Sequence, residues 1–410
     1  MRRADVVVIG GGQAGLAMSR VLEGRGVPHA VLERGRVGER WRSERWDSLR
    51  LLTPRWQARL PGLRYDGPEP DGFMTRGEVV ALLERYAAGA RAPVEEGVEV
   101  RSVERWGGGF RIWTGEEAWA ARAVVVATGH CQEARVPEWA RALPPGITQV
   151  EPTRYRNPSR LPAGGVLVVG ASATGVQLAA ELHASGRPVT LAAGRHTRAP
   201  RRYRGRDLMW WYDAAGIADD RTSAVADVEA ARRSPSLQLV GSPDHRTLDL
   251  AALERMGVRL AGRALGVLGG RVVFGRDLTR HAAEADARLG RLLARIDAFA
   301  AARGLDAPQA DPPPPFRPGD GPEALDLAAE GIRTVLWATG YRRSYPWLHV
   351  PALDARGELV HEGGVTPVSG LYALGLPFLR RRKSAWLDGV GDDARELADH
   401  LLGALARRAA

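Results

Sequence analysis

Short, uninterrupted apolar runs followed by small residues are the clearest pattern along the chain. Residues 5–9 and 29–33 are such runs, and they flank a stretch with helical spacing over 13–24. An apolar run of β-branched residues is typical of a strand buried in a parallel sheet. The N-terminus therefore predicts a β-strand, a helix and a second parallel strand. Three further strands are predicted over 98–103, 110–113 and 121–127.

The same pattern begins again in the middle of the chain. A strand is predicted over 165–169, a helix over 175–185 and a strand over 188–192, with a later apolar run at 334–338. Helical spacing continues over 278–302, and a proline-rich stretch at 311–315 predicts a rigid loop or boundary. We predict an α/β protein with two Rossmann-type dinucleotide-binding domains. The two copies of this pattern begin about 160 residues apart.

A glycine-rich loop follows the first predicted strand and has the spacing of a dinucleotide-binding turn. It consists of Gly10, Gly11, Gly12, Gln13, Ala14 and Gly15. The first glycine allows the tight turn, the second admits a pyrophosphate, and the third lets helix and strand pack closely. Glu33, at the end of the next strand, is placed to accept hydrogen bonds from a ribose, with Arg34 beside it. Because a carboxylate repels a 2′-phosphate, this site is predicted to hold FAD or NAD rather than NADP.

A second loop follows the strand at 165–169. It consists of Gly170, Ala171, Ser172, Ala173, Thr174 and Gly175, with serine at the middle glycine position. No acid follows the next strand; the cations are Arg195, His196 and Arg198. Cations at this position match a 2′-phosphate, so NADPH is predicted here. Solvated surface charge is the alternative explanation.

Small residues also end two other apolar strands. They are Ala127, Thr128 and Gly129 in the first unit, and Ala338, Thr339, Gly340 and Tyr341 in the second. In a doubly wound sheet such strand ends face the cofactor crevice. One such end in each unit supports the prediction of two cofactor sites.

Composition excludes several classes of protein. The net charge of +10 comes almost entirely from dispersed arginines, and no nucleic-acid-binding motif accompanies it. The single cysteine, Cys131, excludes a cysteine-pair redox site within one chain, and no metal site is predicted. The N-terminus lacks a signal-peptide pattern and no apolar run is long enough for a membrane span. We therefore expect a cytoplasmic protein that contacts neither nucleic acid nor membrane.

These motifs together resemble the class B flavin-containing monooxygenases, in particular the FMO-like bacterial oxidoreductases and plant YUCCA-type enzymes. The resemblance extends from Val7 to about Leu401 and is weakest over 205–330. It also rests on segments that resemble the family's flavin-side and C-terminal motifs: Arg40 and Trp41, Trp46 to Pro54 with Leu52 and Thr53, Tyr155 to Pro158, and Gly389 to Ala394 with Val390. The resemblance implies an FAD domain built from both ends of the chain, 1–160 and 336–410, and interrupted by an NADPH domain with a helical insertion, 161–335.

The resemblance also implies a reaction. NADPH would reduce FAD, and the reduced flavin would form a hydroperoxide with O2 that inserts one oxygen atom into a small organic substrate. Most of this chemistry belongs to the cofactor, which agrees with the lack of a catalytic dyad or triad in the sequence. A homodimer is left open.

One departure from the family pattern keeps an alternative open. Glu151 stands where the family has histidine, four residues before Tyr155. An NADPH-dependent flavin oxidoreductase that passes electrons to an acceptor without oxygenation is the alternative. A redox-sensing module without turnover is a third function, and two complete cofactor sites argue against it.

Overall fold

The apolar run at the N-terminus forms the centre of the first sheet. The computed structural model describes residues 1–407, so residues 408–410 of the predicted C-terminal domain lie outside the described residues. The sheet contains, in spatial order, β3 (Val94–Glu96), β2 (His29–Glu33), β1 (Arg2–Ile9), β6 (Ala118–Val126), β5 (Gly109–Trp113) and β4 (Ser102–Trp106), with β19 (Leu371–Ala373) also paired to β6. Both neighbours of β1 are parallel to it, whereas β5 is antiparallel to β6 and β4 is antiparallel to β5. Val6, Val7 and Val8 have no exposed surface, as expected for a strand with both faces covered.

The second sheet repeats this plan in the middle of the chain. Its order is β13 (Arg259–Ala261), β10 (Val189–Ala192), β9 (Gly165–Val169), β17 (Ile332–Trp337) and β8 (Thr148–Val150), and all neighbours are parallel. Alternate residues of β9 point to opposite faces. Val166 and Val168 belong to one hydrophobic core, while Leu167 and Val169 belong to another. Both faces of this sheet are therefore buried.

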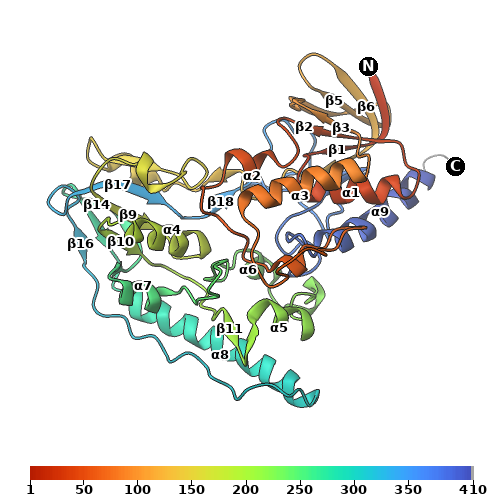
Figure 1. The fold of residues 1–410 in the computed structure, drawn as a ribbon. Helices are drawn as coiled ribbons and strands as arrows, with labels where there is room; N and C mark the ends of the chain where they lie inside the picture. The colour runs from red at the N-terminus through yellow and green to blue at the C-terminus, as the bar shows by residue number, and fades with distance from the viewer. Residues whose placement is uncertain (408–410) are drawn as a thin grey trace.

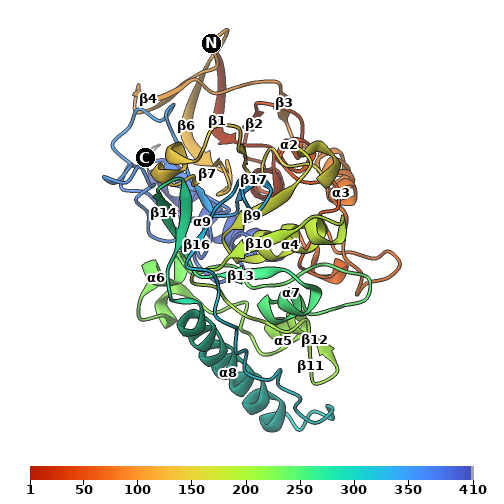
Figure 2. The same ribbon diagram turned by 90° about the vertical axis from the view of Figure 1, so that its left-hand side faces the viewer.

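Helices cover the sheets and extend the second unit. They are α1 (Gln13–Glu23), α2 (Glu39–Ser43), α3 (Arg76–Gly89), α4 (Ala173–Ala184), α5 (Leu208–Ala214), α6 (Val228–Arg232), α7 (Leu250–Met256), α8 (Leu278–Ala302) and α9 (Val390–Arg407). The C-terminal helix α9 packs against α1, so both ends of the chain lie in the first unit (Figure 1). Figure 2 shows α8 along the edge opposite the first sheet. No helix within residues 1–407 is long and apolar enough to cross a membrane.

The chain passes between the two sheets along two paired segments. β7 (Glu133–Ala134) leaves the first sheet, and β18 (Tyr341–Arg342) returns from the second. They pair antiparallel, and Arg342 Nε donates to Glu133 Oε2 at 2.7 Å. The two crossings are thus held together as one short ribbon beside both sheets.

Most predicted elements are confirmed, with shifts at their ends. The α/β fold with parallel sheets is confirmed, and α8 spans the predicted 278–302. The strand predicted over 98–103 was wrong, because pairing with β5 begins only at Ser102. The helix α3 was not predicted, although Thr75 and Glu78 form a capping box at its start.

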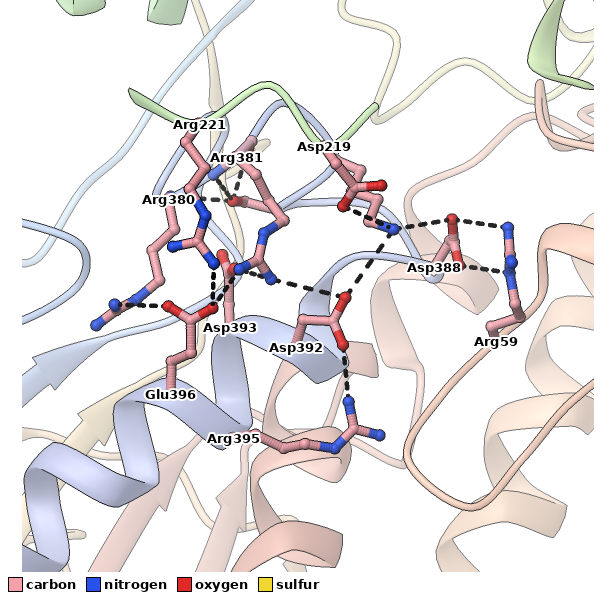
Figure 3. A network of polar contacts seen from close by, with 12 residues as sticks. Arg59, Asp219, Arg221, Arg380, Arg381, Asp388, Asp392, Asp393, Arg395 and Glu396 are labelled. Carbon is pink, nitrogen blue, oxygen red and sulfur yellow. Dashed lines mark hydrogen bonds and ion pairs between the residues drawn. The ribbon is translucent and has the colours of Figure 1, made fainter. Parts of the chain in front are cut away.

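A polar network fixes the loop before α9 against residues 217–222 (Figure 3). The amides of Arg382 and Lys383 donate to the carbonyls of Asp220 and Ala218, each at 3.0 Å. Lys383, the sole lysine of the chain, also has its Nζ 3.1 Å from Asp219 Oδ1. The C-terminal segment of the first unit is therefore bonded directly to the segment that follows α5.

Asp393, in the first turn of α9, is the most deeply buried carboxylate of this network. Its side chain has no exposed surface, and Ser384 and Arg381 are the polar neighbours that favour its ionised form most. Burial raises the pKa of Asp393 to about 6, although Arg381, with Nη1 3.3 Å from Oδ1, favours the ionised form. Ionised Asp393 therefore costs stability near neutral pH.

We predict that Asp393→Asn removes this cost. The pKa of about 6 in the folded protein lies above the value of about 3.9 in an unfolded chain. As the pH rises from about 4 to 6, the free energy of unfolding of the parent protein therefore falls by about 3 kcal/mol relative to that of Asp393→Asn. Above pH 6 the difference between the two proteins stays constant. Melting temperatures measured across pH 4–8 check this expectation. Asp392→Asn, a change at the exposed neighbouring residue, is the control, and a parallel pH profile for all three proteins would contradict the prediction.

Candidate functional site

A large cleft opens at the carboxyl ends of the parallel strands of both sheets. It has a volume of 2720 Å³ and is lined by both glycine-rich loops. In the first sheet, β1 lies between β2, the next parallel strand in the chain, and β6. In the second sheet, β9 lies in the same way between β10 and β17. Open α/β sheets bind ligands at such points, because the loops diverge and leave a crevice.

The first glycine loop is packed backbone to backbone. Gly10 has φ +112°, and a Cβ there would lie 2.6 Å from the carbonyl oxygen of Ala127. A Cβ on Gly15 would lie 1.8 Å from the carbonyl oxygen of Gly10. A Cβ on Gly12, which lines the cleft, would meet nothing within 4 Å. Gly10 and Gly15 are thus required by the fold, whereas Gly12 leaves room at the N-terminus of α1.

Glu33 closes the first loop from the end of β2. Its Oε2 accepts a hydrogen bond from Gly11 N at 2.6 Å, and its Oε1 accepts one from Gly35 N at 2.9 Å. The carboxylate lines the cleft, and each oxygen keeps further acceptor capacity. Arg34 also lines the cleft and donates to Glu44 at 3.2 Å.

The second loop repeats this packing. Gly170 has φ +108°, and a Cβ there would lie 2.2 Å from the carbonyl oxygen of Ala338. A Cβ on Gly175 would lie 1.8 Å from the Gly170 carbonyl oxygen. Ser172 begins α4 in an extended conformation that any residue adopts, and its side chain caps nothing. Serine is therefore compatible with this position, and its hydroxyl is available at the cleft together with Thr174.

The predicted cations after β10 separate in space. Arg195 lines the cleft and is exposed. His196 is buried, does not line the cleft, and has its pKa lowered by burial, so it is neutral near pH 7. Arg198 reaches the cleft wall, but Asp249 and Asp286 neutralise it with contacts of 2.7 Å each. Of the three, only Arg195 offers an uncompensated charge.

Two cations that the sequence did not single out lie beside Arg195. They are Arg288 and Arg291 on α8, and both line the cleft. Arg288 Nη2 donates to the backbone oxygen of His196 at 2.7 Å, which places it at the end of β10. Burial lowers the pKa of Arg288, the nearby Glu284 raises it in part, and Arg195 and Arg291 lower it. Within residues 1–407 no ion pair joins any of these three arginines to a carboxylate; the nearby Glu284 is bonded to Arg280 at 2.6 Å.

The two motifs with alanine, threonine and glycine lie at the strand ends as expected and line the cleft. Thr339 Oγ1 donates to the carbonyl oxygen of Arg135 at the crossing between the sheets. Tyr341 begins β18 and pairs with Ala134, and burial raises its pKa to about 12. The second motif thus contributes to the crossing between the sheets as well as to the cleft.

The segments that resemble the family's flavin-side and C-terminal motifs line the cleft only in part. Arg40, Trp41, Leu52 and Thr53 line it, as do Gln13 and Ala14. Arg40 Nη1 and Nη2 donate to the carbonyl oxygens of Cys131 and Gln132, so this side chain ties α2 to the loop after β6. Trp46 lies in the core of the second unit and Val390 in that of the first. Neither residue lines the cleft. Three residues of the glycine-rich loops, Gly15, Ala173 and Gly175, do not line it either.

The corner beneath Arg40 is electropositive. Burial raises the pKa of the Cys131 thiol, but His130, Arg45 and Arg40 outweigh burial and bring the pKa down to about 7. A substantial fraction of the thiol is therefore ionised near neutral pH.

The opposite wall of the cleft is largely apolar. Met209 and Tyr212 on α5, Leu289 on α8 and Trp386 contribute to it, and the Tyr212 and Trp386 rings lie 6.3 Å apart. Glu151 also lines the cleft. This wall joins the short helix α5 to the long helix α8 and to the loop before α9, so its composition becomes clear only in three dimensions.

Comparison with known proteins agrees with this architecture. The pyridine nucleotide-disulphide oxidoreductase family model matches residues 7–206. A CzcO-like oxidoreductase of Geobacillus kaustophilus is 32% identical over 401 residues, covering 97% of this chain and 98% of the relative. The indole-3-pyruvate monooxygenase YUCCA1 of Oryza sativa is 32% identical over 180 residues, 43% of this chain and 44% of that protein. A variant flavin monooxygenase from Stenotrophomonas maltophilia has a TM-score of 0.68 at 21% identity, with 98% and 99% of the two chains covered.

The fold is similar to that of flavin monooxygenases, and the class of protein that the comparisons define is an oxidoreductase, an enzyme. The match over almost the full length of both chains is more specific, and this chain belongs to the CzcO-like oxidoreductases.

Proposed function

We propose that the protein is an FAD- and NADPH-dependent monooxygenase that inserts one oxygen atom from O2 into a small organic substrate. The observation that carries the proposal is that both glycine loops open into one cleft, so that two dinucleotides can meet there. FAD would occupy the first loop and NADPH the second. The bound flavin would supply hydride acceptance and oxygen activation, while the chain binds, orients and excludes water.

The geometry of the first loop fits FAD. Space above Gly12 and the N-terminus of α1 suit a pyrophosphate, and Glu33 at the end of β2 suits a ribose rather than a 2′-phosphate. We propose that Gly10, Gln13, Ala14, Arg34, Arg40, Trp41, Leu52, Thr53 and the strand end at 127–129 form the remaining contacts. Trp46 and Val390 support the site through packing.

The second loop fits NADPH. Ser172, Thr174 and the strand end at 338–341 would contact the dinucleotide, and Arg195 with Arg288 and Arg291 would hold the 2′-phosphate. We leave His196 out of this set because it is buried and neutral. We also propose that the domain borders lie at the paired crossings β7 and β18, since β8 already belongs to the second sheet.

Glu151 supports a second candidate function. It places a carboxylate in the cleft where the related family has histidine, beside the second cofactor site. An NADPH-dependent flavin oxidoreductase that passes electrons to an acceptor without oxygenation would tolerate this change. The two functions differ in the fate of O2.

The first test is spectroscopic. The purified protein is loaded with FAD, reduced anaerobically with NADPH or NADH, and then mixed with O2 and methyl phenyl sulfide. We expect faster bleaching of the flavin by NADPH and formation of the sulfoxide. Bleaching followed by stoichiometric hydrogen peroxide without sulfoxide, whatever the substrate offered, would favour the oxidoreductase. A protein that cannot be loaded with FAD would refute both functions.

Gly12→Ala tests the first cofactor site. Gly12 has φ −87°, which alanine adopts, and its Cβ would meet no protein atom, so the melting temperature of the FAD-free protein should not change. FAD binding should weaken by at least roughly tenfold, because the methyl group fills the approach of the pyrophosphate. Titration followed by flavin fluorescence measures the affinity. Gly15→Ala is the contrasting variant: its Cβ would overlap the Gly10 carbonyl, so this variant should lose stability without FAD. Unchanged FAD affinity in Gly12→Ala would place the cofactor elsewhere.

Arg288→Gln tests the second site. A charge-assisted hydrogen bond to phosphate contributes about 1.5–3 kcal/mol, so the KM for NADPH should rise roughly tenfold or more. The KM for NADH, which lacks the 2′-phosphate, should change little. Arg303→Gln, at the far end of α8, is the matched control. An equal rise for both nucleotides would show that Arg288 does not read the 2′-phosphate.

A further inference from the structure

Arg201 is a buried cation that belongs to neither proposed cofactor set. It lies in the segment 201–206, which also contains Arg202, Arg204 and Arg206. Its side chain has no exposed surface and does not line the cleft. Its neighbour Arg202 is exposed. A fully buried guanidinium is expensive unless its surroundings satisfy it, so its contacts are informative.

The guanidinium of Arg201 bridges two walls of the cleft. Nη1 donates to the carbonyl oxygen of Leu52 at 2.7 Å, and Nη2 donates to Asp207 Oδ1. The same carboxylate oxygen of Asp207 accepts a hydrogen bond from Met209 N at 2.8 Å and so caps α5. Leu52 lies on the flavin-side wall, whereas Met209 and Tyr212 of α5 lie on the apolar wall. One buried ion pair therefore fixes the two walls relative to each other.

The surroundings allow little other movement of the flavin-side segment. A Cβ on Gly241 would lie 2.1 Å from the carbonyl oxygen of Leu51, so the second unit touches this backbone closely. Leu51 N donates to Met74 O at 2.8 Å, and the Phe73 ring stacks on the Arg201 guanidinium at 4.8 Å. Three contacts thus hold the segment. Among them, only the contact made by Arg201 comes from a charged side chain of the second unit.

We propose that Arg201, held by Asp207, is a positioning residue that sets the distance between the flavin-side segment 51–53 and the apolar wall of the substrate compartment. The inference rests on the proposed function, because it takes segment 51–53 as the wall beside the flavin ring. The planar fork of arginine suits this task, since it donates to a carbonyl and a carboxylate at once in fixed directions. Lysine would keep the buried charge but not that fixed pair of directions.

The test uses the FAD-loaded full chain and the variants Arg201→Lys, Arg201→Met and Asp207→Asn, with Arg202→Met as the matched control. The principal readouts are quenching of flavin fluorescence by iodide and the visible circular dichroism of bound FAD. Arg201→Lys and Arg201→Met should raise the iodide quenching constant at least threefold and change the flavin dichroism. FAD affinity should stay within threefold, because the first glycine loop is unchanged. Asp207→Asn should give a smaller effect, since asparagine can still cap Met209 N, and Arg202→Met should match the parent.

Coupling gives a second readout in the same variants. If methyl phenyl sulfide is a substrate, the fraction of NADPH that yields sulfoxide should fall severalfold in Arg201→Lys while the rate of flavin reduction changes less than twofold. The proposal is overturned if Arg201→Lys and Asp207→Asn lower the melting temperature but leave quenching and dichroism equal to those of the parent. Should Arg201→Met fail to fold, Arg201→Lys and Asp207→Asn decide the question. Failure of the parent to bind FAD would instead refute the proposed function.

Discussion

Contact between backbone atoms at the two glycine loops is the constraint on which the site depends. In each unit the carbonyl oxygen of the first glycine lies where a side chain on the last glycine would be, and the end of a neighbouring strand presses on the first glycine. This contact fixes the angle between strand and helix, and therefore the direction in which the helix N-terminus points. Because both loops obey the same constraint, two helix N-termini face one cleft. The middle position carries no such restriction, which explains why Gly12 and Ser172 can differ.

The second requirement is that the two units keep a fixed relation. The chain crosses between them as the paired strands β7 and β18, which alone would permit rotation. Two further links oppose rotation: the polar network before α9 and the contact of Arg201 with the Leu52 carbonyl. Both links involve the region around α5, which contributes the apolar wall of the cleft. The inserted unit is thus coupled to the first unit at the place where a substrate would bind.

The sequence predicted the parts of the site that follow from local backbone chemistry. Both glycine loops, Glu33 and the two small strand ends lie at the cleft as expected, because strand, turn and helix signals are contiguous in the chain. Side chains that reach the cleft from distant elements could not be predicted. Arg288 is brought to Arg195 only by the path of α8, and His196, adjacent to Arg195 in sequence, turns into the interior. Burial of Arg201 could not be predicted either, because other arginines follow it closely in sequence and nothing local marks which of them turns inward.

The arginines illustrate why net charge alone says little about function in this protein. Arg198 and Arg201 are neutralised by Asp249, Asp286 and Asp207 and serve the architecture. Arg195, Arg288 and Arg291 form no ion pair with a carboxylate of the described chain, and both Arg195 and Arg291 lower the pKa of Arg288. A dianionic phosphate is the kind of group that such a cluster of arginines suits, because each guanidinium can donate charge-assisted hydrogen bonds to it. The uncompensated arginines, rather than the net charge of +10, are therefore the electrostatic feature from which a nucleotide preference can be argued.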